Sequence, residues 1–160
     1  KCDLMESIAN HVTTAAEKLR KQNCIAKGIA VSIRTSPFKN GPQYYNSHVI
    51  NLTTGTSITH KLIMHAFESL NQIYKSGFEY KKAGIMLFDI QPKQYSQLSF
   101  FGENDSLQED HLMRIIDQLN YRSGSGTVKH AACGVNRFWK MLSEMKSPSY
   151  STRWSDLIHI

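Results

Sequence analysis

The sequence has few cysteines, no metal-binding histidine spacing and no long apolar run. Cys2, Cys24 and Cys133 lie far apart and form no C-x-x-C pair, so neither a disulfide framework nor a structural zinc site is indicated. Among the seven histidines, His60 and His65 come closest to a ligand pair, but a spacing of five puts them on different helix faces. No apolar run approaches the roughly 20 residues that span a membrane. We therefore expect no metal, no cofactor and no membrane partner.

A recognisable catalytic signature is also absent. The thirteen carboxylates are scattered, and no Ser/His/Asp or Cys/His set shows a local motif. Residues 123–127 (SGSGT) have the glycine and serine content of a phosphate-binding loop, but they lack its Gly-Lys-Ser/Thr ending and the preceding buried strand. We interpret them as a flexible turn after a helix, and we predict no catalytic residue.

Positive charge is in excess but unevenly distributed. The formal net charge is +6: residues 1–95 carry 12 Lys or Arg against 6 Asp or Glu, residues 96–120 carry 1 against 5, and residues 121–160 carry 6 against 2. Two basic blocks therefore flank an acidic bridge. A basic surface suits contact with phosphates, since neutralised phosphates release counterions. Charge alone is weak evidence, because many basic proteins bind no nucleic acid.

The spacing of apolar residues predicts an α+β fold in the order α-β-β-α-β. Helical spacing covers residues 3–21 and follows again after Thr59, which we expect to be the N-cap of the second helix. Alternation with a period of two predicts strands over residues 25–35, 45–53 and 81–90. This order predicts a small antiparallel-rich sheet with two helices on one face, which leaves the other face to solvent or a partner.

A small helical unit is expected at the C-terminal end. Ser106 and Glu109 form a capping box that opens a helix, residues 127–131 suggest a short strand, and residues 135–145 suggest another short helix. The side chains expected to pack this unit together are Leu112, Ile115, Ile116, Leu119, Phe138, Trp139 and Leu142. We expect Trp139 to be a core or docking anchor rather than a catalytic residue.

One face of the predicted sheet is small and basic. Gly28, Ala30, Ser32 and Arg34 alternate toward the side without helices, so another backbone can approach that strand closely. The candidate phosphate-binding residues are Lys27, Ser32, Arg34, Lys39, Lys81 and Lys82. Backbone N–H groups and cationic side chains of this kind hold phosphates without reading sequence. A solvated antiparallel face is normally polar too, so both interpretations stay open at this point.

Residues 97–101 form a second candidate contact, made of Gln97, Leu98, Ser99, Phe100 and Phe101. Leu98 and Phe100 alternate as they would in another half-buried strand. Alternatively, the stretch is an extended peptide between two periodic regions, whose amide, leucine and paired aromatics suit an apolar groove on a partner. The pattern alone leaves both alternatives open.

Eight short segments, each modest by itself, match one known family in order over nearly the whole chain. They are residues 15–20 (AAEKLR), 34–38 (RTSPF), 44–45 (YY), 80–87 (YKKAGIML), 97–101 (QLSFF), 124–127 (GSGT), 139–141 (WKM) and 147–153 (SPSYSTR). Together they resemble the UmuC family, the catalytic subunit of bacterial DNA polymerase V within the Y-family translesion polymerases. Their combined specificity is high because all occur in the same order.

The resemblance implies a division of the chain. Residues 1–95 would be the little finger domain, which holds template–primer duplex through backbone contacts. Residues 96–105 would be a linker with the bacterial sliding-clamp motif, in which Phe100 replaces the usual leucine. Residues 106–160 would be the C-terminal region peculiar to UmuC-type polymerases. A UmuD-type regulatory dimer is a further implied partner, and the implied location is the bacterial cytoplasm, at the nucleoid.

The resemblance also implies parts that this chain lacks. The palm, whose carboxylates hold two Mg²⁺ ions, is not matched, so we expect no polymerisation by this chain alone. A complete little finger has a strand before its first helix, and this chain begins at the helix. We therefore expect either that residues 127–131 supply a substitute strand or that the unpaired sheet edge associates with another strand.

The role expected from these features is to hold DNA and tether a sliding clamp in an error-prone polymerase of DNA repair and the SOS response. The alternative is a protein-interaction module that docks a regulatory subunit without significant DNA binding. RNA binding is disfavoured because strands 25–35 and 81–90 lack paired exposed aromatics for base stacking.

Overall fold

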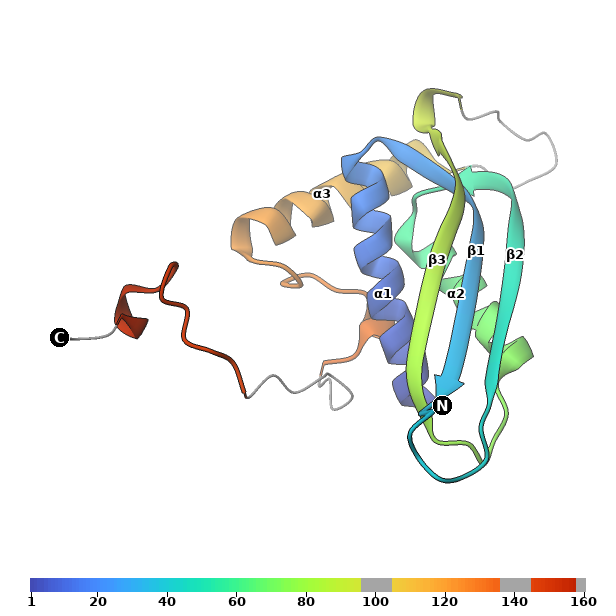
Figure 1. The fold of residues 1–160 in the computed structure, drawn as a ribbon. Helices are drawn as coiled ribbons and strands as arrows, with labels where there is room; N and C mark the ends of the chain where they lie inside the picture. The colour runs from blue at the N-terminus through green and yellow to red at the C-terminus, as the bar shows by residue number, and fades with distance from the viewer. Residues whose placement is uncertain (96–104, 136–144, 158–160) are drawn as a thin grey trace.

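The computed structural model describes residues 1–95, 105–135 and 145–157, and the elements within them follow the predicted order (Figure 1). The helices and strands are α1 (Cys2–Lys21), β1 (Cys24–Thr35), β2 (Tyr45–Thr56), α2 (Thr59–Ile73), β3 (Tyr80–Pro92) and α3 (Leu107–Ser123). Short 3₁₀ helices are η1 (Lys93–Tyr95), η2 (Ala131–Cys133) and η3 (Trp154–Asp156). No helix in these described ranges is long and apolar enough to cross a membrane.

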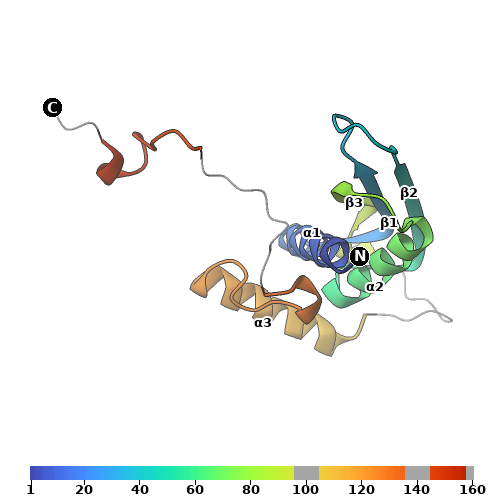
Figure 2. The same ribbon diagram turned by 90° about the horizontal axis from the view of Figure 1, so that it is seen from below.

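The three strands form an antiparallel sheet in the order β2-β1-β3. Helices α1 and α2 cover one face, and the face turned toward the viewer in Figure 1 carries no helix, as the view from below also shows (Figure 2). We call this uncovered side the open face. The α+β fold with two helices on one face of a small sheet is therefore confirmed.

The hydrophobic core lies between the sheet and the two helices. Ile29, Val31 and Ile33 alternate along β1 toward α1 and α2, and all three are buried. Buried apolar side chains at intervals of three or four residues on the two helices pack against the sheet. They are Ile8, Val12, Ala16 and Leu19 on α1 and Leu62, Ala66, Leu70 and Ile73 on α2. Each larger side chain of this kind contributes about 1.5–3 kcal/mol through burial, and together they hold the sheet against the helices.

An aromatic cluster fixes the end of the sheet where β1 turns toward β2. The Tyr44 ring lies 4.9 Å from the Phe78 ring and 6.0 Å from the Tyr80 ring, measured between centroids. The Tyr44 hydroxyl donates to the Ile73 carbonyl at 2.7 Å, and the Tyr80 hydroxyl donates to the Lys75 carbonyl at 2.8 Å. These contacts tie the hairpin and the start of β3 to the end of α2.

Two local predictions were wrong. The N-cap of α2 is Ile58 rather than Thr59, and the Thr59 hydroxyl instead accepts a hydrogen bond from Arg20. Residues 127–131 form no strand, because the Asn120 side chain bonds both the N–H and the carbonyl of Val128 and so holds a turn against α3. Among the described residues no strand joins the three of the sheet, so the substitute-strand prediction fails. Association through a sheet edge stays a prediction.

Candidate nucleic-acid interface

The open face is built from rungs in which a β1 residue lies between one β2 residue and one β3 residue. Arg34 lies between Tyr45 and Lys82, Ser32 between Ser47 and Gly84, Ala30 between Val49 and Met86, and Gly28 between Asn51 and Phe88. Residues paired across strands point to the same face of a sheet. The open face is therefore cationic at the Arg34 rung, hydroxyl-bearing at the Ser32 rung and apolar at the Ala30 rung.

A β-bulge concentrates positive charge beside Arg34. Ala83 pairs with Ile33 and Tyr80 pairs with Thr35, so two residues, Lys81 and Lys82, occupy the space of one between them. A bulge of this kind interrupts the alternation of side chains. Both lysines are exposed as a result, and Arg34 is exposed opposite them. We call Arg34, Lys81 and Lys82 the cationic end.

Gly28 leaves room for the ring of Phe88. A Cβ at this position would come within 2.2 Å of the Phe88 ring, which lies over the glycine. The ring covers backbone that would otherwise be exposed at this rung. Close approach of an outside backbone, predicted along all of β1, is therefore blocked at Gly28 by the protein itself and stays open toward Ser32 and Arg34.

The two remaining predicted cations, Lys27 and Lys39, lie at opposite ends of β1. Lys27 lies near the start of β1, where its side chain and that of Ile25 both lie over Gly55, so it is at the opposite end of the strand from Arg34. Lys39 is in the loop between β1 and β2, at the cationic end, but its ammonium donates to Glu79 at 2.9 Å. Because both partners are exposed, this ion pair is weak and can open for a phosphate.

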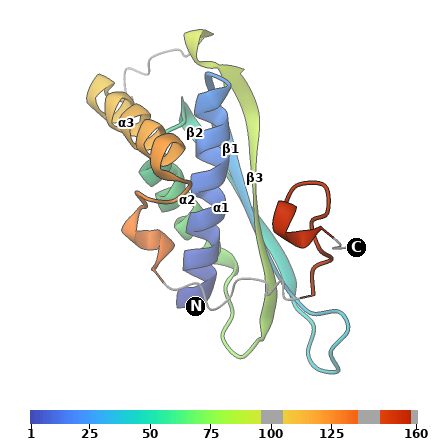
Figure 3. The same ribbon diagram turned by 90° about the vertical axis from the view of Figure 1, so that its left-hand side faces the viewer.

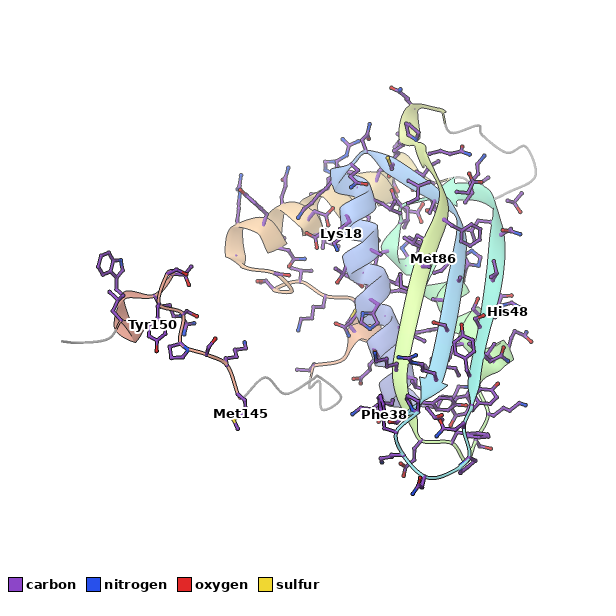
Figure 4. All side chains as sticks on the ribbon, in the orientation of Figure 1. Lys18, Phe38, His48, Met86, Met145 and Tyr150 are labelled. Carbon is purple, nitrogen blue, oxygen red and sulfur yellow. The ribbon has the colours of Figure 1, made fainter. Side chains whose placement is uncertain are left out.

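Sequence reasoning missed the exposed apolar side chains of the open face. Tyr45, Val49 and Met86 are 68%, 52% and 62% exposed, and Figure 4 labels Met86 near the middle of this face. The alternation over β2 and β3 contained the signal, since residues on the side opposite the core must face outward in a sheet covered on one face. The predicted clamp contact at residues 97–101 lies outside the described residues.

Helix α3 docks on the helical layer, on the far side from the sheet (Figures 2 and 3). Its main contact is Arg20 of α1, which donates to both oxygens of Asp117 at 2.7 and 2.8 Å. The same guanidinium donates to the Ser57 carbonyl at 2.7 Å and to the Thr59 hydroxyl at 2.9 Å. One arginine thereby joins α1, the start of α2 and α3.

A second polar contact fixes the start of α3. The Lys61 ammonium lies 3.1 Å from Asp105 and 3.0 Å from Glu109, and Thr56 donates to Asp105 at 2.8 Å. The predicted capping box is confirmed, because Ser106 and Glu109 bond each other's backbone N–H groups. The hydrogen bond from the Ser106 N–H is the largest cause that lowers the pKa of Glu109 to about 2, and the Lys61 ammonium lowers this pKa as well.

The apolar packing predicted for the C-terminal unit is largely wrong for the described residues. Leu112, Ile115 and Leu119 are 53%, 41% and 44% exposed, Ile116 is half-buried, and the buried residue of α3 is Met113. The side of the helix that faces the body carries Asp117 and Glu109 together with Met113, so Leu112, Ile115 and Leu119 face outward instead. Phe138, Trp139 and Leu142 lie outside the described residues.

Acid is expected to weaken this docking. The pKa of Glu109 falls from 4.5 to about 2 on folding, so its stabilising effect is present above pH 4.5 and is lost as the pH falls through this range. Burial lowers the pKa of His130 below 6.5, and the nearby His60 and Arg20 lower it further. The folded state therefore favours the neutral imidazole, so stability also decreases as the pH falls and His130 is protonated. Urea unfolding followed by circular dichroism at several pH values measures both effects. A Glu109→Gln variant should lose stability less steeply below pH 4.5, and an unchanged slope would contradict the assignment.

The described residues define a small α+β domain with one uncovered, partly cationic sheet face and a docked third helix, and no group of potential ligands among them could hold a metal ion. Residues 1–100 match the model of the impB/mucB/samB family C-terminal domain, and residues 110–160 match a domain of unknown function, DUF4113. The chain belongs to the impB/mucB/samB family, of which it represents the C-terminal domain and the region that follows.

Several curated relatives match along almost all of the chain. Protein UmuC of Salmonella typhimurium is 36% identical over 160 residues, covering 99% of this chain and 38% of the relative. Protein SamB of Salmonella typhimurium is 36% identical over 156 residues, covering 96% and 37%, and Protein MucB of Escherichia coli is 31% identical over 156 residues, covering 97% and 37%. The chain thus spans less than two fifths of the length of these relatives.

Proposed function

We propose that this chain is the DNA-holding and clamp-tethering part of an error-prone translesion DNA polymerase that acts in DNA repair and the SOS response. The observation that carries the proposal is the cationic end, where Arg34, Lys81 and Lys82 meet on an uncovered sheet face. Family membership supports the same role. The catalytic palm with its two Mg²⁺ ions would belong to the rest of the polymerase.

The chemistry of the open face suits a duplex held without reading its sequence. Ser32 and Ser47 carry hydroxyl groups next to the cationic end, and Gly84 leaves space beside them. Hydroxyl groups and cations of this kind bond phosphate oxygens, which are the same at every base pair. The face offers no row of amide or carboxylate side chains suited to base edges, so we propose a sequence-independent grip on template–primer DNA.

The residues that flank the proposed clamp contact at residues 97–101 lie at the end of the sheet opposite the cationic end. The segment before it is held where the Lys93 N–H donates to the Asn23 carbonyl at 2.9 Å, and Lys93 pairs with Asp110. The segment after it begins at Asp105, which Thr56 and Lys61 hold. A peptide offered from this end can bind a bacterial sliding clamp while the cationic end holds DNA. A UmuD-type regulatory dimer is a further proposed partner, and the bacterial nucleoid is the proposed location.

Replacing Lys81 and Lys82 with alanine tests the DNA proposal. The double variant should bind every duplex sequence more weakly, and the slope of log affinity against log salt should flatten by roughly one unit per lost phosphate contact. Fluorescence anisotropy with two unrelated duplexes at several salt concentrations gives both quantities. Lys18→Ala is a matched control, because this lysine is exposed on α1, away from the open face. No change in the double variant would favour a pure protein-interaction module instead, and strong sequence discrimination would contradict the sequence-independent grip.

A further inference from the structure

Helix α3 separates its charges by side. Its three acidic residues all face the protein body, where Glu109 pairs with Lys61, Asp110 with Lys93, and Asp117 with Arg20. Its two arginines, Arg114 and Arg122, are exposed, and neither has an ion pair among the described residues. The three carboxylates of the docked helix are thus neutralised by cations of the body. Its outward side presents the two arginines and no carboxylate.

The outward side of α3 is also apolar. Leu112, Ile115 and Leu119 are spaced by three and four residues, so they form one continuous stripe on the helix. Arg122 follows Leu119 by three residues and continues the same line, whereas Arg114, one position before Ile115, lies about 100° farther round the helix. An apolar stripe at this spacing is the arrangement by which one helix packs on another, with flanking charges that choose the partner. We call these three side chains and two arginines the outer face of α3.

We propose that the outer face of α3 is a docking surface for an acidic amphipathic helix of a partner protein. Charge complementarity identifies this occupant, because the surface combines an apolar seam with two arginines and no unpaired carboxylate among the described residues. Leucine-type side chains of the partner pack on the stripe, and its carboxylates meet Arg114 and Arg122. Arginine suits this role because its planar donors match a carboxylate.

This docking surface is independent of the proposed DNA grip. Helices α1 and α2 lie between α3 and the sheet, so a partner on the outer face does not reach the open face (Figures 2 and 3). The ion pairs of Arg20 and Lys61 also hold α3 at a fixed position relative to the sheet. A partner bound to α3 is thus carried on the opposite side of the domain from the duplex.

Two fluorescent synthetic helices of about three heptads test this proposal. The acidic peptide has leucine at positions a and d and glutamate at e and g, and the basic peptide has lysine in place of glutamate. Anisotropy with the chain of residues 1–160 should show binding of the acidic peptide about tenfold or more tighter than that of the basic one. Ile115→Asp should abolish this binding, because it places a charge in the seam. Arg114→Glu combined with Arg122→Glu should invert the preference.

Leu107→Asp is the matched control, since Leu107 is 88% exposed on the same helix but lies off the stripe. This variant should bind like the parent, and circular dichroism checks that each variant is folded. Duplex affinity should be unchanged when the acidic peptide is bound, which separates this proposal from the DNA grip. The proposal is overturned if neither peptide binds, if both bind equally, or if Ile115→Asp has no effect. It is equally overturned if Ile115→Asp dissociates a dimer of the chain, or if the outer face binds anionic phosphatidylglycerol vesicles in preference to the peptide.

Discussion

Replacing Arg20 with alanine should lower the free energy of unfolding by about 3 kcal/mol or more, because it leaves a largely buried carboxylate without its partner. Asp117 keeps only 22% of its side chain exposed, and the Arg20 side chain is 11% exposed. The change also removes donors from the Ser57 carbonyl and the Thr59 hydroxyl. Urea unfolding of the full chain, followed by circular dichroism, measures the loss.

Two further variants show whether the ion pair is the cause. Arg114→Ala removes an exposed arginine that has no ion pair among the described residues, so it should change stability by less than about 0.5 kcal/mol. Arg20→Met combined with Asp117→Leu replaces the pair by apolar side chains and should recover much of the loss. An Arg20→Ala variant as stable as the parent would show that α3 does not depend on this contact.

Changing Gln97, Leu98 and Phe101 together to alanine should abolish binding to the bacterial sliding clamp. Burying Leu98 and Phe101 in a groove of the clamp would contribute about 1.5–3 kcal/mol each, so their loss should weaken binding about 100-fold or more. Gln97 would orient the peptide through an amide that both donates and accepts. Surface plasmon resonance with immobilised clamp measures the affinity.

The proposed tether would compensate for the weakness of the proposed DNA grip. Phosphate contacts from a few cations are sensitive to salt and give short residence, whereas a linked clamp raises the local concentration of the domain at the primer end. The triple variant should therefore keep its fold and its affinity for free duplex. Ser99→Ala is the control inside the same peptide and should bind the clamp normally. Unfolding of the triple variant would instead identify these residues as a core strand, and unchanged affinity would remove the clamp proposal.

The helices and strands of the sheet domain could be predicted because local spacing and tertiary burial agree there. Ile29, Val31 and Ile33 alternate in sequence and are all buried on the helical side. The element order, and with it the uncovered face, followed from this agreement. Ser106 and Glu109 were equally accessible to prediction, because a capping box is local and its two hydrogen bonds depend on only four residues.

The orientation of α3 could not be predicted from its own pattern. The spacing of its apolar residues predicted that the side with Leu112, Ile115 and Leu119 would be buried. The helix is instead held through Asp117 and Glu109, which lie on the opposite side. Arg20 and Asp117 lie 97 positions apart in the chain, and nothing in the sequence near either residue indicates the other. The bulge on the open face could not be predicted either, because it depends on the pairing of β3 with β1. The sequence Lys81-Lys82 predicts charge, but it does not indicate that both residues lie opposite Arg34.

The bulge at Lys81 and Lys82 has a consequence for how the length of this chain can change during evolution. An insertion or deletion of one residue within a regular strand exchanges the two faces for every residue beyond it, because the alternation has a period of two. At the bulge the chain already holds one residue more than the alternation requires. Loss of either lysine would leave Ala83 and Tyr80 on the core side and remove one positive charge from the open face. A related chain could therefore change its charge here by a single-codon deletion that the fold absorbs, without exchanging the two faces of β3.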